Sequence, residues 1–231
     1  MATVKYGGGI IQMSGSIAGV THARNRYGNY TRPRTKPINP RSPGQTQIRN
    51  IVSQLAEMWN DGMTSTKRAA WDLYATHIAM KNRLGETVYL TGFNHFIRSN
   101  SARLQAGTGI ITAGPTTFTL PGKDSSFAVT ITAATQVISI TFDNSQTWAL
   151  QPTGRFILFN GRPQLATHNF FNGPWKFVGS IGGNTPVPPA SPAVLTATNV
   201  FTAGQKAWVY ARISEADGRL SEPFRSSILV V

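Results

Sequence analysis

Residues 126–142 read SFAVTITAATQVISITF, and this stretch decides the fold class expected for the second half of the chain. Phe127, Val129 and Ile131 alternate with smaller or hydroxyl-bearing residues, and the same alternation resumes at Ile138 after a short break. Strict alternation sends successive side chains to opposite faces of a strand, so that one face is apolar. The stretch therefore predicts two neighbouring β-strands, each with one buried face.

The same signature recurs as far as the C-terminus. Further runs rich in β-branched and aromatic residues begin at Arg155, Trp175, Ala193, Lys206 and Phe224, with turn-forming residues between them. The dipeptide Asp217-Gly218 separates the last two runs and is a strong hairpin signal. Seven short strands in one segment are typical of an immunoglobulin-like or fibronectin III-like domain. We therefore predict an α+β chain with an antiparallel β-sandwich over residues 108–231.

Residues 43–107 carry a helical period instead. Ile48, Val52, Leu55 and Trp59 follow one another at three- and four-residue steps and form one apolar stripe. Two further helices are expected downstream, with starts capped by Thr64 or Ser65 and by Thr91, and with chain reversals at Gly62, Gly85 and Gly107. We predict a small helical region here.

The N-terminal segment, residues 1–42, shows neither period. The stretch His22–Gln45 carries six Arg or Lys, no acidic residue and several prolines, which favour extended geometry. We predict an extended, basic, Gly- and Pro-rich arm that is ordered only on a partner surface. Its apolar and aromatic side chains are the expected assembly contacts: Ile10, Ile11, Met13, Ile17, Tyr27 and Tyr30.

Charge is distributed unevenly along the chain. The net charge is +13, and eight basic residues precede Glu57, the first acidic residue. Such asymmetry is the electrostatic footprint of a contact with nucleic acid or with another acidic surface. The candidate residues for phosphate or acidic-surface contact are Arg24, Arg26, Arg32, Arg34, Lys36 and Arg41.

No catalytic, metal-binding or cofactor-binding motif is recognisable in the sequence. The chain has no cysteine, and its four histidines are scattered without a second ligand at metal-binding spacing. The Gly-rich stretch near the N-terminus lacks the Lys and Ser/Thr of a phosphate-binding loop. Glu215, Asp217 and Glu222 cluster only around one predicted hairpin, where turn geometry explains acidic residues. We predict no enzymatic activity, no metal and no cofactor.

Four segments stand out, in this order: the basic stretch around Arg24–Arg34, MWNDGMTSTKRAAWDLYA, NRLGETVYLTGFNHFIRSN and the terminal ADGRLSEPF. In this order they resemble a group of proteins of unassigned function encoded by tailed bacteriophages and by prophage-like or metagenomic contigs, generally near virion structural genes. The shared positions include Gln45, Arg49, Trp59, Trp71, Gly85, Gly92, Asn94 and the Asp217–Leu220 turn. The resemblance implies a virion context and assigns no catalytic residues.

The predicted function is therefore that of a structural protein of a bacteriophage virion, as a capsid, decoration, connector or tail subunit. The expected partners are further copies of the chain through arm exchange, other virion proteins and packaged DNA. We expect synthesis in the host cytoplasm and no membrane association, since no apolar run suits a signal peptide or a spanning helix. Two alternatives stay open: a nucleic-acid-binding module that uses the basic arm, and a surface-adhesion or receptor-binding protein.

Overall fold

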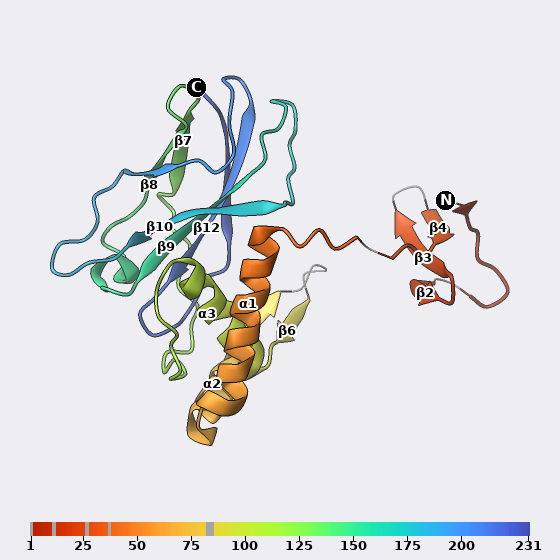
Figure 1. Cartoon of the computed structure of the whole chain (residues 1–231), viewed down its shortest axis with the longest axis horizontal. Coiled ribbons are helices and arrows are strands. Elements are labelled where there is room, and N and C mark those ends of the chain that lie inside the picture. Colours follow the sequence, from red (N-terminus) through yellow and green to blue (C-terminus); the bar gives the residue numbers. More distant parts are fainter. Residues whose placement is uncertain (1, 11–12, 26–27, 37, 82–85) are drawn as a thin grey trace. The chain divides into compact units, whose positions relative to one another are not determined.

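The structure is a computed structural model, and it describes residues 2–10, 13–25, 28–36, 38–81 and 86–231. The chain is α+β, and its contacts divide it into two compact units, residues 1–45 and 46–231 (Figure 1). The contacts do not divide residues 46–231 further. Independent folding of residues 108–231 therefore stays a prediction.

The N-terminal unit is a small antiparallel sheet with strand order β1-β4-β3-β2. Its strands are β1 (Ala2–Thr3), β2 (Gly15–Ile17), β3 (Val20–Asn25) and β4 (Gly28–Pro33). β3 and β4 pair from Val20–Pro33 to Asn25–Gly28, while β2 and β1 add short outer strands. The described residues between Arg34 and Ser42 have no regular secondary structure and lead to the first helix.

This sheet corrects the expectation of an extended arm without regular secondary structure in the N-terminal segment. The strands contain mostly Thr, Arg, Asn and Gly, with Ile17 and Val20 as the main apolar side chains. Hydrophobic alternation marks a strand only when one face is buried, and neither face of this sheet is. Main-chain pairing forms these strands without a pattern that the sequence would reveal.

The helical region follows the predicted boundaries closely. α1 (Pro43–Glu57) continues into a π-helical turn (Met58–Gly62), and α2 (Ser65–His77) and α3 (Gly92–Gln105) follow. Thr64 Oγ1 accepts a hydrogen bond from Lys67 N at 3.4 Å, and Thr91 Oγ1 accepts one from Asn94 N at 3.3 Å. Both side chains act as the predicted N-caps. Gly107 follows α3 with a φ of 75°, as expected of a helix C-terminus, whereas Gly85 lies outside the described residues.

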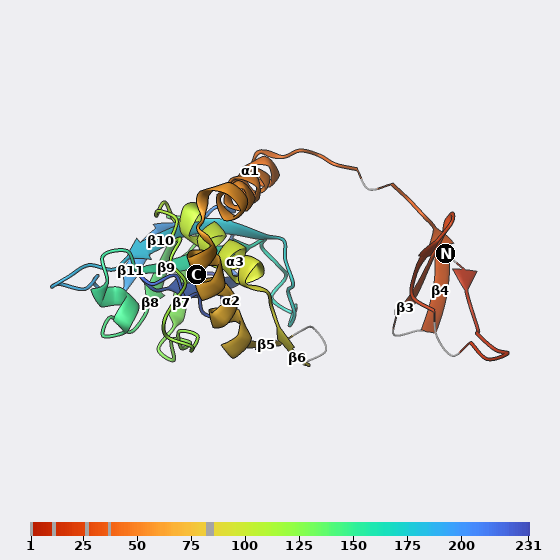
Figure 2. The ribbon, with the colours of Figure 1, turned by 90° about the horizontal axis from the view of Figure 1, so that it is seen from below.

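The helices enclose an aromatic core. Trp71, Tyr74 and Phe96 are buried together with Leu55. The rings of Trp71 and Phe96 pack edge to face, with their centroids 5.6 Å apart. A two-stranded hairpin, β5 (Ala79–Lys81) and β6 (Thr87–Tyr89), connects α2 to α3. α1 lies at the margin of this layer and buries only Leu55 (Figure 2).

Two antiparallel sheets make up the remainder of the chain. One has the order β10-β9-β12-β13, and the other has the order β11-β8-β7. One core, which includes Ile131, Ile140, Phe156 and Val209, takes side chains from both sheets. All seven predicted strands are present, and Gly218 occupies the predicted turn after β12 with a φ of 94°. The strands are β7 (Ala128–Thr132), β8 (Val137–Thr141), β9 (Arg155–Gly161), β10 (Trp175–Gly182), β11 (Ala193–Thr196), β12 (Lys206–Ser214) and β13 (Phe224–Leu229).

α3 joins the helices to the sheets. Ala102 packs against Ile157 and Phe159 on the face of the four-stranded sheet that points away from the shared core. The guanidinium of Arg98 donates to the main-chain oxygens of Leu220 and Ser221, at 2.7 Å each.

Arg103 makes the second polar connection from α3. Its Nη1 donates to the main-chain oxygens of Thr153 at 3.3 Å and Glu215 at 3.1 Å, and its Nε donates to Gly109 O at 3.2 Å. Arg103 is only 2% exposed, and burial lowers the pKa of its guanidinium. One side chain thus satisfies main-chain acceptors from three segments of the chain.

We expect Arg103→Ala to destabilise the C-terminal unit by roughly 3 kcal/mol, because it removes the donor to the carbonyl groups of Gly109 and Thr153 and opens a cavity. Arg162→Ala removes the same charge from an exposed position and should change stability by less than about 0.5 kcal/mol. Urea denaturation followed by tryptophan fluorescence measures both. Equal stability of the two variants would contradict this role of Arg103.

Candidate functional site

The N-terminal segment has no core of its own. Leu55 is the first buried residue along the described chain, and none of the described residues from 3 to 54 is buried. The sheet of the N-terminal unit therefore exposes both faces. Its register determines which side chains each face presents, because directly paired residues of an antiparallel sheet point to the same side.

One face carries a row of apolar side chains. Ile17 pairs with Val20, and Val20 pairs with Pro33, so the three side chains form a row across β2, β3 and β4. We call this row the apolar face. Ile17 is 63% exposed and Val20 is 40% exposed. On the same side, His22 Nδ1 lies 3.2 Å from Tyr6 Oη, which places one aromatic ring over part of the sheet.

The opposite face is polar and positively charged. Ser16 pairs with Thr21, and Thr21 pairs with Arg32, so two hydroxyls and a guanidinium form a row across the same three strands. Ser16 Oγ lies 2.8 Å from Thr21 Oγ1, in agreement with this register. Arg34 N donates to Gly19 O at 2.9 Å, which extends the ladder and puts Arg34 on the same side as Arg32. We call these four side chains, Ser16, Thr21, Arg32 and Arg34, the cationic face.

The structure separates the predicted assembly residues. Ile17 belongs to the apolar face, whereas Tyr30 pairs with Ala23 on the side of the cationic face. Ile10 is 47% exposed and Met13 is half-buried, both in the loop between β1 and β2. Ile11 and Tyr27 lie outside the described residues.

Sequence reasoning missed three further apolar residues of this segment. Val20 and Pro33 complete the apolar face, and Ile38 in the linker is 92% exposed. The signal for Ile38 was available, since it is an isolated apolar residue between Lys36 and Pro40 in a basic segment. Val20 and Pro33 needed the register.

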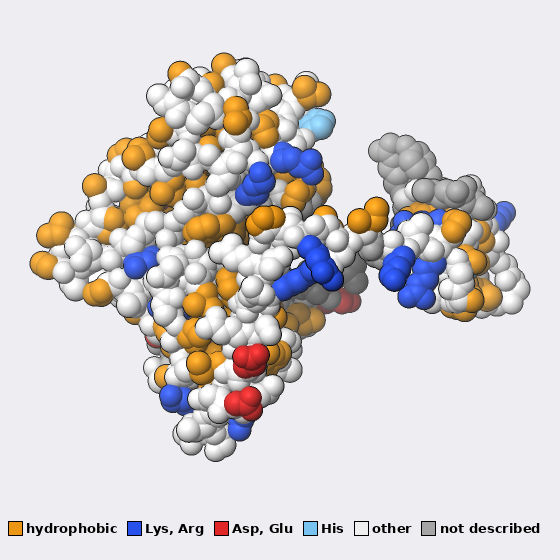
Figure 3. Space-filling view, viewed as in Figure 1, with side chains coloured by type: hydrophobic (Ala, Val, Ile, Leu, Met, Phe, Trp, Pro, Cys, Tyr) orange, Lys and Arg blue, Asp and Glu red, His pale blue; other side chains and the backbone are white. Residues whose placement is uncertain are grey.

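The predicted phosphate-contact residues are also divided. Arg32 and Arg34 lie on the cationic face, and Arg24 lies on the side of the apolar face. Lys36 and Arg41 follow in the linker, and Arg26 lies outside the described residues. Figure 3 shows Lys and Arg side chains grouped on the N-terminal unit.

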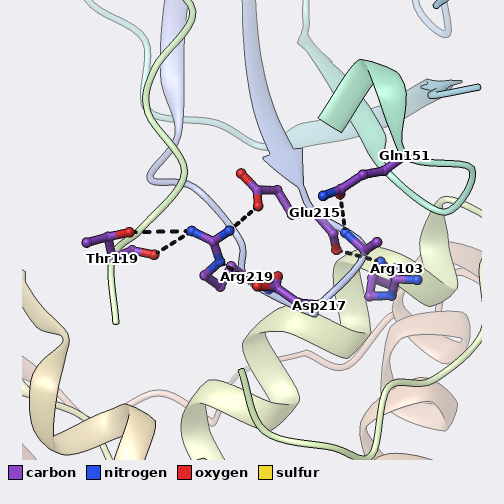
Figure 4. Close-up of polar contacts among 7 residues, drawn as sticks. Arg103, Thr119, Gln151, Glu215, Asp217 and Arg219 are labelled. Atoms are coloured by element: carbon purple, nitrogen blue, oxygen red, sulfur yellow. Dashed lines mark hydrogen bonds and ion pairs between the residues drawn. The ribbon is translucent and has the colours of Figure 1, made fainter. Parts of the chain in front are cut away.

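The acidic cluster at the β12–β13 turn is held by one arginine. Arg219 contacts the carboxylates of both Glu215 and Asp217, and its Nη1 donates to Thr119 O at 3.2 Å (Figure 4). Asp217 Oδ1 accepts from Arg219 N at 3.0 Å, which is the turn geometry expected for this cluster. Burial raises the pKa of Glu215, and the neighbouring Arg219 opposes that shift.

A cavity of about 190 Å³ borders the same carboxylate. It is lined by Pro121, Gly122, Gln146, Thr147, Trp148, Ile213 and Glu215. Glu215 Oε2 is already paired with Arg219, and Glu215 O accepts from Arg103. The described contacts of Glu215 are therefore structural ones that fix the β12–β13 turn.

His95 is the most unusual titratable residue of the helical layer. It is fully buried, and neither ring nitrogen has a hydrogen-bond partner among the described residues. Its ring meets that of Tyr74 edge to face at 5.3 Å. Burial, with a smaller effect of the nearby Arg98 charge, lowers the pKa of His95 to about 4. His95 is therefore neutral in the folded protein near neutral pH.

Among the described residues, no three His, Asp or Glu side chains lie close enough together to hold a metal ion. In the same part of the chain, no helix is both long and apolar enough to cross a bilayer.

Comparisons of the chain with protein-family models, with curated proteins and with solved structures found no match. The functional inference therefore depends on the geometry and charge of the N-terminal unit.

The lowered pKa of His95 predicts a loss of stability in acid. The unfolded chain takes up a proton near pH 6.5, whereas the folded protein resists protonation down to about pH 4, so stability should fall as the pH decreases through this window. The effect is on the order of 3 kcal/mol at the acid end. His95→Phe should flatten this part of the pH profile of urea denaturation. His168→Phe, at an exposed position, should leave the profile unchanged, and identical profiles for wild type and His95→Phe would refute the assignment.

Proposed function

We propose that this chain is a structural protein of a bacteriophage virion, a capsid, decoration, connector or tail subunit, and that it assembles through its N-terminal unit. The absence of any buried described residue before Leu55 carries this proposal. The resemblance to virion-associated phage proteins supplies the virion context.

A sheet without a core needs a partner surface. Ordering each residue of a chain costs roughly 1–2 kcal/mol of conformational entropy, which burial of apolar surface normally offsets. A sheet of a few strands is independently stable only when a hydrophobic face is covered. The apolar face exposes Ile17 and Val20, so covering it supplies the missing burial.

The proposed cover is another copy of the chain, which is the arm exchange expected of shell and tube subunits. The linker from Arg34 to Ser42 spans up to ~30 Å when extended, enough to reach beyond the subunit's own surface. Ile38 in the linker, and Ile48 and Val52 on α1, are exposed apolar side chains along the same path. Each of these three side chains adds apolar surface that a neighbouring copy can cover.

We also propose that residues 108–231 form an immunoglobulin- or fibronectin III-like sandwich that serves as the rigid body of the subunit. The shared core of the two sheets supports this reading, as do the contacts of β13 with β7 and of β10 with β11 along the two edges. A rigid body with a tethered docking unit suits a repeating assembly.

The charges of the two units predict how salt affects this assembly. Residues 1–45 carry seven basic and no acidic residues, which leaves +6 of the total +13 on residues 46–231. Copies therefore repel one another at low salt, and screening should strengthen their association. Nucleic-acid-free protein should form larger particles in light scattering at ~150 mM than at ~10 mM salt, where the Debye lengths are ~8 and ~30 Å.

The double change Ile17→Ser/Val20→Ser should reduce these particles to monomers, because it removes the apolar face. Thr21→Ser/Ala23→Ser alters the other side of the sheet and should leave the particle size unchanged. Wild-type protein that stays monomeric at high concentration and ~150 mM salt would sink the proposal.

A second candidate, attachment to a receptor, is favoured by a separate observation. Leu165, Phe170 and Val200 are strongly exposed in loops of the C-terminal unit. Asn199 Nδ2 donates to Gly161 O at 2.9 Å, which holds the loop of Val200 to the end of β9. Lys206 Nζ donates to Asn169 Oδ1 at 3.2 Å, which holds the loop of Leu165 and Phe170 to the start of β12. Leu165→Ser/Phe170→Ser would then weaken binding to host cells and leave particle size unchanged.

A further inference from the structure

We propose that the cationic face of the N-terminal sheet binds the phosphate backbone of a nucleic acid. The site consists of Ser16, Thr21, Arg32 and Arg34, with Lys36 and Arg41 of the linker continuing it. It lies on the side of the sheet opposite the apolar face, so one unit can contact a protein and a nucleic acid at the same time.

The cationic face presents a row of hydrogen-bond donors across three strands. Register brings Ser16, Thr21 and Arg32 side by side, although Arg32 is eleven residues from Thr21 in the sequence. Directly paired side chains have Cβ atoms ~5 Å apart, so hydroxyl and guanidinium donors can converge on one phosphate group. Hydroxyls, guanidinium groups and backbone N–H groups supply most protein contacts to nucleic-acid phosphates.

Positively charged side chains continue from this row into the linker. Arg32 and Arg34 point to the same side of β4, ~6.7 Å apart, and Lys36 and Arg41 follow in the linker. From Arg32 to Arg41 the chain reaches at most ~30 Å, which corresponds to about nine base-pair rises of ~3.4 Å. The evenly spaced phosphates of an extended polyanion match such a line.

No carboxylate side chain within residues 1–45 competes with an external anion for these cations. The sequence has no Asp or Glu before Glu57, so no internal ion pair within residues 1–45 neutralises these cations. Arg32 and Arg34 are both exposed. Their charges are available to an external anion. Arginine suits phosphate in particular, because its planar fork can bind two oxygens at once.

Salt dependence gives the quantitative expectation. Each phosphate neutralised on duplex DNA contributes about −0.9 to the slope of log affinity against log salt. Contacts from four cations predict a slope near −3.6 and a loss of about 150-fold between 50 and 200 mM salt. Assembly through the apolar face has the opposite salt dependence, so the two activities are separable.

The experiment measures binding of the full-length, nuclease-treated protein to a fluorescent duplex oligonucleotide and to one of its single strands, across a salt series. Arg32→Ser should reduce the loss of duplex affinity over this range to about 40-fold, since one phosphate contact is removed. Arg34→Ser should act in the same way and lies just beyond the end of β4, where disruption of the strand is not a concern. Arg32→Lys should restore most of the slope.

Arg24→Ser is the matched control. It removes one positive charge from a strand of the same sheet, but on the other side, and should leave the slope unchanged. Equal effects of Arg24→Ser and Arg32→Ser would overturn the inference, because attraction would then depend on net charge alone. Absence of binding to either oligonucleotide at ~50 mM salt would also overturn it. The relative affinities of duplex and single strand identify the form of nucleic acid that the face accepts.

Light scattering of the same variants separates this inference from the proposed function. Normal assembly with no oligonucleotide binding would reject the nucleic-acid contact alone. Face-dependent oligonucleotide binding by the Ile17→Ser/Val20→Ser variant, with assembly lost, would support two independent faces.

Discussion

The attachment of α3 to the strands is the interaction on which the C-terminal unit depends. Arg98 and Arg103 project from one helix and donate to main-chain oxygens near the β12–β13 turn and at Thr153. Buried carbonyl groups without donors would cost about 1–3 kcal/mol each, so these two side chains determine where the helical layer can lie. Apolar packing of Ala102 on Ile157 and Phe159 then excludes water from the same contact.

The N-terminal unit, in contrast, is not organised around buried contacts. No described residue from 3 to 54 is buried, and main-chain pairing is the principal interaction within the sheet. Such a sheet presents two different surfaces without the constraint of an interior. We propose that the apolar face contacts another copy of the chain and that the cationic face binds a polyanion. On these two proposals, the unit would join subunits of a shell or tube while contacting nucleic acid.

Helices and strands that bury one face could be predicted from the sequence. Their buried face is apolar, so apolar residues recur at a regular spacing. The alternation at Phe127–Ile131, the caps at Thr64 and Thr91, and the Asp217-Gly218 turn all appear in the structure where the sequence placed them. The strands of the N-terminal unit escaped prediction because both of their faces are exposed. In β3, Thr21 and Ala23 alternate with His22 and Arg24, so no apolar period exists to be recognised.

The sequence by itself determined the charge of the N-terminal segment, its lack of acidic residues and the α+β class, since these depend on composition and local period. Only the tertiary structure decided which side chains share a surface. Strand register makes Thr21 and Arg32 neighbours, and the docking of α3 makes Arg98 and Leu220 neighbours. Because the members of each pair are far apart in the sequence, no local sequence pattern reveals the contact. The candidate site follows from that register: a shift of one residue would exchange the two faces, moving Arg32 to the apolar side.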